Sequence, residues 1–148
     1  MIISPSILIC QVALLLSMLG TGVVHTSNIN LSITNLRNSK GHVLVSVFNS
    51  EEGFPEKATA AVRTEKISIT NKQATTIFAG LPPGRYAIAL LHDENDDMKM
   101  NTNFFGIPKE GYGFSNNVMG SFGPPSFSRA SFEHLETKTS LVSIRMKY

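Results

Sequence analysis

The residues best suited to chemistry form a run of carboxylates and carboxamides that begins at Asp93. Asp93, Asn95 and Asp97 alternate along the chain, as do the first three side-chain ligands of a calcium-binding loop. Lys99 would add a backbone carbonyl at the seventh position of such a loop, and Asn101 a carboxamide oxygen at the ninth. Because calcium prefers oxygen ligands on a turning loop, the spacing predicts a calcium site formed by these residues.

Two positions depart from the calcium-loop pattern. Met98 stands where the pattern has a glycine for its sharp turn, and Phe104 stands where it has a bidentate glutamate. The alternative is a solvated turn, in which Asp and Asn side chains form hydrogen bonds to their own backbone. The sequence leaves both interpretations open, and calcium is the one cofactor that it suggests.

A stretch rich in aromatic residues and glycines follows this acidic run. Glycines allow a ligand to approach the backbone closely, and aromatic rings provide contact area at a small entropic cost. A glycan or a peptide segment is the expected ligand; the alternative is that the rings fold back and cap the domain. The candidate ligand-binding residues are Phe104, Phe105, Glu110, Tyr112, Phe114, Asn116 and Asn117.

The sequence supports a catalytic site less well than a binding site. A general acid–base pair would draw on His92, Asp93, Glu110 and His134, but His92 and Asp93 are neighbours at a strand end and should point to opposite faces. The histidines, including His42, also lack the paired spacing of a zinc site. We therefore predict no catalytic residues and a non-enzymatic protein, with a hydrolase of unrecognised type as the alternative.

The elements that must position these groups are strands, because apolar residues alternate along most of the chain. The residues Asn38 to Gly41 are typical of a hairpin turn and predict that the first two strands pair. A long loop, residues 93–125, would carry the candidate sites. About seven short strands predict one antiparallel β-sandwich, immunoglobulin-like or transthyretin-like. The expected strands cover residues 29–34, 42–48, 66–70, 74–78, 86–91, 127–135 and 140–146.

The N-terminal stretch has the layout of a secretory signal. Residues 7–19 are apolar apart from Gln11 and Ser17, and small residues follow. We predict a signal peptide over residues 1–25, cleaved between about 20 and 26, and a sandwich domain over residues 26–148. A retained membrane anchor is the alternative, although a spanning helix needs about 20 apolar residues.

The composition of the chain limits the classes of partner that it is suited to bind. Cys10 is the single cysteine, so the exported domain would contain no disulfide. The formal net charge is +2 and charges of both signs are interspersed, which argues against a nucleic-acid-binding stripe. We expect a periplasmic or secreted protein that binds an extracellular or envelope ligand, protein or glycan, with no membrane span after cleavage.

Several motifs resemble those of known families. LPPGRYAIA at 81–89 is similar to a turn and strand of transthyretin-like and carboxypeptidase-regulatory-like sandwiches. HDEN at 92–95, NTNFFGIPKEGYGFSNN at 101–117 and FGPPSF at 122–127 resemble the bacterial domain of unknown function 2141 family. The resemblance covers residues 31–148 and implies an exported single β-sandwich, with no activity to carry over. Relatives tend to have glycine where this chain has Met98, and an acidic residue where it has Asn101.

These observations predict a binding or accessory module that acts through the loop at residues 93–125. The alternative is a structural envelope domain stabilised by calcium bound in that loop.

Overall fold

The computed structural model describes residues 27–148. The expected signal peptide and its cleavage zone therefore lie outside the described residues, as does Cys10. Among the described residues, no helix has the length and apolar character needed to cross a membrane.

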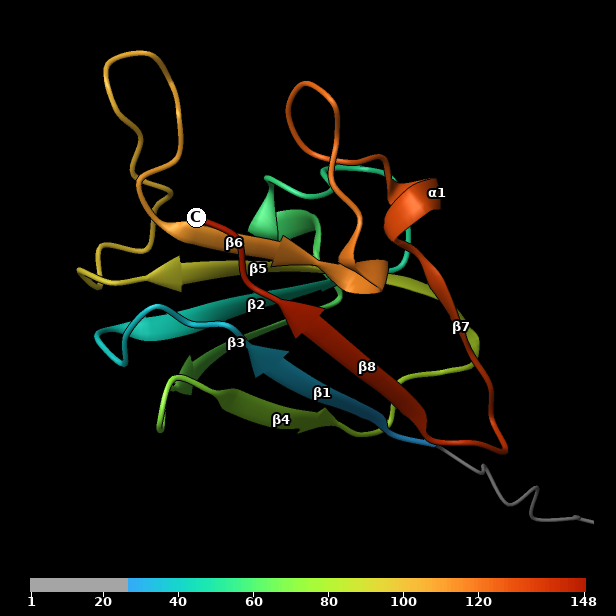
Figure 1. The fold of residues 1–148 in the computed structure, drawn as a ribbon. Coiled ribbons are helices and arrows are strands. Elements are labelled where there is room, and N and C mark those ends of the chain that lie inside the picture. Colours follow the sequence, from blue (N-terminus) through green and yellow to red (C-terminus); the bar gives the residue numbers. More distant parts are fainter. Residues whose placement is uncertain (1–26) are drawn as a thin grey trace, which may run out of the picture.

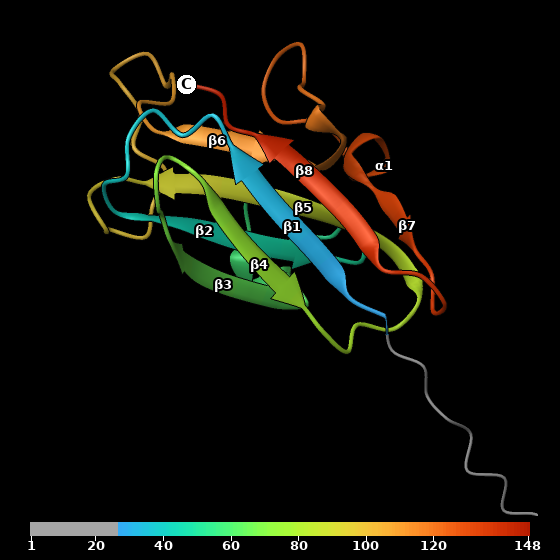
Figure 2. The same ribbon diagram turned by 60° about the horizontal axis from the view of Figure 1, so that its bottom comes forward.

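Two β-sheets pack face to face (Figure 1). In the three-stranded sheet, β1 (Ile29–Thr34) lies between β4 (Ala74–Phe78), which is antiparallel to it, and β8 (Ser140–Arg145), which is parallel. Figure 2 brings this sheet to the front. The all-β sandwich expected from the sequence is confirmed.

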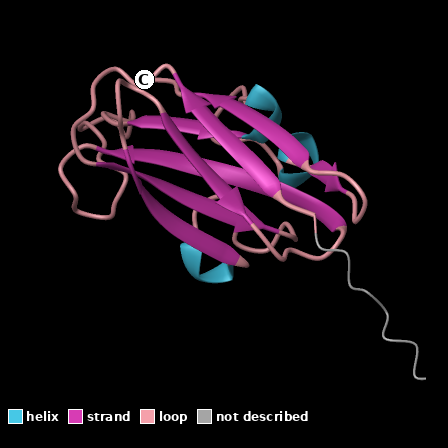
Figure 3. Ribbon diagram, turned by 90° about the horizontal axis from the view of Figure 1, so that it is seen from below, coloured by secondary structure: helices cyan, strands magenta, loops and turns pink. Residues whose placement is uncertain are grey.

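The second sheet is antiparallel and runs in the order β3 (Arg63–Ser68), β2 (His42–Phe48), β5 (Gly84–Asp93) and β6 (Gly111–Phe114). A short strand, β7 (Phe132–His134), pairs with the beginning of β5. Three short helical segments lie at the periphery of the strands (Figure 3): η1 (Ala58–Ala60), η2 (Ser115–Asn117) and α1 (Phe127–Ala130).

The main core lies between the sheets and follows from alternation. Every second residue of β1 and β2 is buried, so that one face of each strand supplies apolar side chains. A second apolar cluster covers the opposite face of β5, where Phe48, Ala89 and Phe114 pack with Phe54 and Phe127. Since β5 is buried on both faces, its apolar run is continuous rather than alternating.

The predicted hairpin between the first two strands is wrong. β1 pairs with β4 and β8, whereas β2 pairs with β3 and β5, so residues 35–41 carry the chain from one sheet to the other. The positive φ expected of Gly41 in this turn is confirmed, at 62°. Long-range contacts at the ends of the connection decide its path: Asn35 donates to the carbonyl of Met146, and Asn38 donates to Glu94.

The single long loop predicted over residues 93–125 is also wrong, because it contains β6 and η2. In the sequence GYGF, the two glycines are depleted in strands and weaken the strand signal of Tyr112 and Phe114. Its glycines instead allow close packing: a Cβ on Gly111 would lie 2.5 Å from the ring of Tyr148, and one on Gly113 would lie 2.9 Å from Ile144. The strand predicted over residues 127–135 begins as helix α1 and becomes β7. Eight strands result, rather than about seven.

Candidate functional site

Asp93 is the last residue of β5 and is fully buried. Its carboxylate accepts hydrogen bonds from the backbone N–H groups of Asp97, at 3.1 Å, and Met98, at 2.9 Å. These bonds wrap the chain after β5 into a tight turn around the carboxylate. Met98 has a φ of 63°, so it adopts the left-handed conformation for which the pattern of a calcium loop uses glycine.

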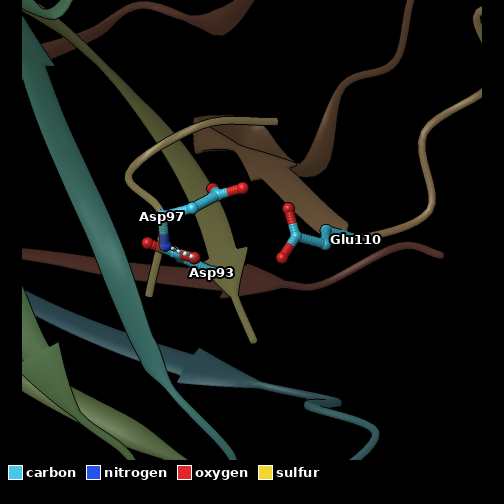
Figure 4. A group of neighbouring side chains, drawn as sticks. All are labelled: Asp93, Asp97 and Glu110. Carbon is cyan, nitrogen blue, oxygen red and sulfur yellow. Dashed lines mark hydrogen bonds between the residues drawn. The ribbon is translucent and has the colours of Figure 1, made fainter. Parts of the chain in front are cut away.

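Glu110 lies immediately before β6 and is also buried. It accepts hydrogen bonds from the N–H of Glu94, at 3.0 Å, and from the N–H of Asn101, at 3.1 Å. One carboxylate therefore joins the start and the middle of the segment that connects β5 to β6. Carboxylate oxygens of Asp93, Asp97 and Glu110 all lie within 4.8 Å of one another, and Figure 4 shows the three side chains converging.

The sequence predicts Glu110 as a ligand-binding residue and joins it with Asp93 only in the disfavoured acid–base set, and not among the calcium ligands. The grouping depends on the antiparallel pairing of β5 with β6, in which His92 lies opposite Gly111. Asp93 and Glu110 each lie one residue beyond that pair, and so they meet at one end of the sheet. A prediction of strand β6 from the sequence would have placed Glu110 beside Asp93.

Asp97 is exposed and accepts hydrogen bonds from the side-chain amides of Asn101, at 2.9 Å, and Asn95, at 3.0 Å, and from the N–H of Lys99, at 2.9 Å. The bond from Asn101, followed by that from Asn95, lowers the pKa of Asp97. All five predicted calcium ligands therefore lie in one turn. Asn95 and Asn101 direct amide nitrogens toward Asp97, so their oxygens would coordinate an ion only after the amides rotate.

The connection between β1 and β2, together with strands β2 and β3, holds this turn in place through ion pairs and hydrogen bonds. Glu94 pairs with Arg37 and accepts a hydrogen bond from Asn38 at 2.8 Å. Burial raises the pKa of Glu94, but the hydrogen bonds from Asn38 and Arg37 outweigh it and leave the pKa lowered. Asp96 contacts Lys66 at 3.0 Å and His42 at 2.6 Å, and these bonds lower its pKa.

Gly41 provides the closest backbone approach to the site. A Cβ at this position would lie 1.9 Å from the carbonyl oxygen of Asp93 and 2.8 Å from the Cα of Glu94. Glycine is therefore required both for the positive φ and for the space beside the end of β5.

Among the described residues, the three histidines do not form a common site. His92 is fully buried, donates through Nε2 to the carbonyl of Lys40 at 2.9 Å, and lies 2.6 Å through Nδ1 from the hydroxyl of Tyr148. His134 contacts Ser140 at 2.8 Å, and His42 contacts Asp96. Each imidazole thus has its own structural partners.

The aromatic candidates divide into exposed and inward-facing groups. Phe104 and Phe105 are 97% and 82% exposed, at the end of a loop closed by a bridge between Thr102 and Pro108. We call residues 102–108 the first tip. Tyr112 is half-buried, and Phe114 belongs to the second core cluster.

Asn116 and Asn117 are exposed residues whose side chains support neighbouring elements. Asn116 donates to the carbonyls of Arg129, at 3.1 Å, and Ser131, at 2.9 Å. Asn117 pairs with the edge of β8, where it donates to the carbonyl of Ser143 at 3.0 Å and accepts from the N–H of Arg145 at 2.8 Å.

A second exposed phenylalanine lies in a loop outside the set of ligand-binding residues predicted from the sequence. Phe122 is fully exposed, with a relative exposure of 102%, in the loop between η2 and α1. We call residues 120–124 the second tip. Figures 1 and 2 agree that the loops carrying both tips project from the same side of the molecule, beyond β6. The sequence SFGPP indicates this exposed loop, because its phenylalanine stands among turn-forming residues.

Comparison with known proteins identifies one family. The profile described as "Uncharacterized protein conserved in bacteria (DUF2141)" matches residues 31–142. No curated protein and no solved structure matches the chain.

Proposed function

The chain belongs to the bacterial DUF2141 family, and from the loops that it displays we propose that it is an exported, non-enzymatic binding module. The two tips form the binding surface, and the sandwich with its Asp93–Glu110 network is the scaffold. Export is supported by the signal-like N-terminal sequence. A non-enzymatic role is supported by the separate hydrogen-bonding partners of the buried histidines.

The observation that carries this proposal is the exposure of whole phenylalanine side chains. Phe104, Phe105 and Phe122 leave nearly all of their surface in water, although burying one such side chain is worth about 1.5–3 kcal/mol. Aromatic residues are also enriched among the residues that dominate binding energy at interfaces. Exposed apolar side chains on two loops that project from one side of the molecule are typical of a binding site.

The scaffold beneath the first tip is suited to holding it still. Glu110 ties the N–H groups of Glu94 and Asn101, and Lys109 donates its N–H to the carbonyl of Asn101 at 2.8 Å. A loop held in one conformation loses less entropy when it binds. The tip is therefore presented as a preformed element.

Photo-crosslinking tests the proposal. With benzoylphenylalanine at position 105, we expect a specific crosslinked product in the exporting cell, because this side chain is where the ligand makes contact. The matched control is the same probe at Leu141, which is 81% exposed on β8. Mass spectrometry of the product identifies the ligand. Equal products from both positions, or none from position 105, would contradict a binding role for the first tip.

Calcium binding is the second candidate function. It is favoured by the approach of Asp93, Asp97 and Glu110 to within 4.8 Å, since a divalent ion would relieve the repulsion among their carboxylates. The ion would fix the base of the first tip, and the protein would then be a structural domain of the envelope stabilised by calcium.

We expect calcium to raise the thermal stability if this candidate is correct. A free concentration about a hundred times Kd would add about 2.7 kcal/mol to the free energy of unfolding, measured by denaturation with calcium or chelator. Asp97→Asn should abolish the gain, whereas Glu136→Gln, at an exposed turn, should retain it. An unchanged melting temperature at millimolar calcium would exclude the calcium role and leave the binding proposal intact.

A further inference from the structure

The two tips share a composition that narrows the class of ligand. Residues 100–108 contain no charged residue and no histidine, and neither do residues 111–128. Within these stretches, Phe104, Phe105, Ile107 and Phe122 are exposed. The surface that each tip presents is thus apolar and free of charge, although the loops lie on the outside of the molecule.

The backbone of the first tip is already hydrogen-bonded within the tip. The side-chain oxygen of Asn103 accepts from the N–H of Phe105, at 2.9 Å, and from the N–H of Ile107, at 3.0 Å. The main chain of Asn103 also donates to Ile107, at 2.8 Å, and accepts from Gly106, at 3.0 Å. Entry of such a tip into an apolar medium would strand few N–H groups, and unpaired backbone groups are the main cost of burying irregular backbone in lipid.

Positive charges lie at the bases of the loops. Lys99 and Lys109 flank the first tip, and Arg129 follows the second; all three are exposed. Among the nearby carboxylates, those of Asp93 and Glu110 are buried and engaged with backbone N–H groups, and that of Glu94 is paired with Arg37. The carboxylate of Asp97 is exposed and offsets part of the charge of Lys99, so Lys109 and Arg129 are, of these three, the cations free to meet headgroups. Apolar tips with basic residues behind them match the cross-section of a bilayer, in which anionic headgroups lie above the acyl chains.

We propose that the ligand of the two tips is a bilayer surface containing anionic phospholipid, into which Phe104, Phe105 and Phe122 insert. This inference rests on the binding role proposed above. A bilayer accepts projecting apolar side chains without shape complementarity, whereas a protein partner would need a cavity for each tip. A glycan partner would need polar side chains beside the rings, and the first tip uses its Asn103 side-chain oxygen internally.

Tryptophan fluorescence provides a local test, because the chain contains no tryptophan. Phe104→Trp and Phe122→Trp are prepared separately in protein recovered from an exporting host, with Leu141→Trp as the matched control. With vesicles of phosphatidylcholine and phosphatidylglycerol, we expect a blue shift at both tips and quenching by brominated acyl chains. Leu141→Trp should show neither change, even if another part of the chain also contacts lipid.

Affinity provides the second readout. Replacing Phe104 and Phe105 together by serine should weaken binding to the mixed vesicles at least about tenfold, whereas Leu141→Ser should leave it unchanged. Binding should also weaken as salt rises or when phosphatidylglycerol is omitted, because Lys109 and Arg129 contribute through charge.

The outcomes separate this inference from the function on which it rests. Unquenched tryptophan at both tips would overturn the lipid inference. If the probe at position 105 then crosslinks to a protein or a glycan, the binding role stands with a different ligand. If vesicles and crosslinking both fail, both proposals fall. Equal quenching at position 141 would show that lipid contact is not made by the tips and would also overturn the inference.

Discussion

Gly41→Ala is expected to destabilise the domain by about 3–5 kcal/mol, a large part of the about 5–15 kcal/mol by which an ordinary domain is stable. The added Cβ would lie 1.9 Å from the carbonyl oxygen of Asp93. Because the obstacle is backbone at the paired ends of β2 and β5, rotation of a side chain cannot relieve it. Urea denaturation followed by far-ultraviolet circular dichroism measures the change.

Gly80→Ala is the matched control, since Gly80 also has a positive φ, of 72°, but a Cβ there would have no atom within 4 Å. It isolates the conformational cost of placing alanine in the left-handed region, about 1–2 kcal/mol. The difference between the two variants measures the steric contact with Asp93. A Gly41→Ala protein as stable as the Gly80→Ala protein would show that the end of β5 can move away.

Glu110→Gln is expected to cost about 2–3 kcal/mol and to loosen the whole first tip. The carboxylate accepts two backbone N–H bonds, whereas an amide would turn its NH₂ group toward one of these donors. Hydrogen exchange should accelerate at the amides of Glu94 and Asn101. Denaturation and exchange are both measured with chelator present, so that loss of an ion does not contribute.

Glu136→Gln provides the control for this change, because Glu136 is exposed in the turn after β7. Its stability should match that of the unaltered protein within about 0.5 kcal/mol. If the amides of Glu94 and Asn101 keep their protection in Glu110→Gln, the carboxylate is not what joins the two parts of the loop.

The fold was predictable where burial is local and periodic. β1, β2 and β8 follow from alternation, because each has one face in the core. β6 was not predictable, because Gly111 and Gly113 carry no apolar pattern. Their presence is explained only by Tyr148 and Ile144, which pack against them from the end of the chain.

The candidate site was predictable in part for the same reason. Asp93 and Asp97 lie within one turn, so their spacing alone places them together. Glu110 joins them through the pairing of two strands, which the spacing does not encode. Whether an aromatic ring is buried or exposed depends on the tertiary contacts available to it. Phe114 packs in the cluster around Phe54, whereas Phe104 projects into solvent.

The parallel pairing of β1 with β8 joins the first and last strands of the domain. β1 therefore lacks one of its two neighbours until the end of the chain is available, and Tyr148 completes the contact with His92 beside the site. A chain that is still being synthesised cannot close the sandwich, since this pairing spans nearly the whole described sequence. The three-stranded sheet therefore stays incomplete until β8 has been made, and until then the part of the domain already synthesised lacks a closed core.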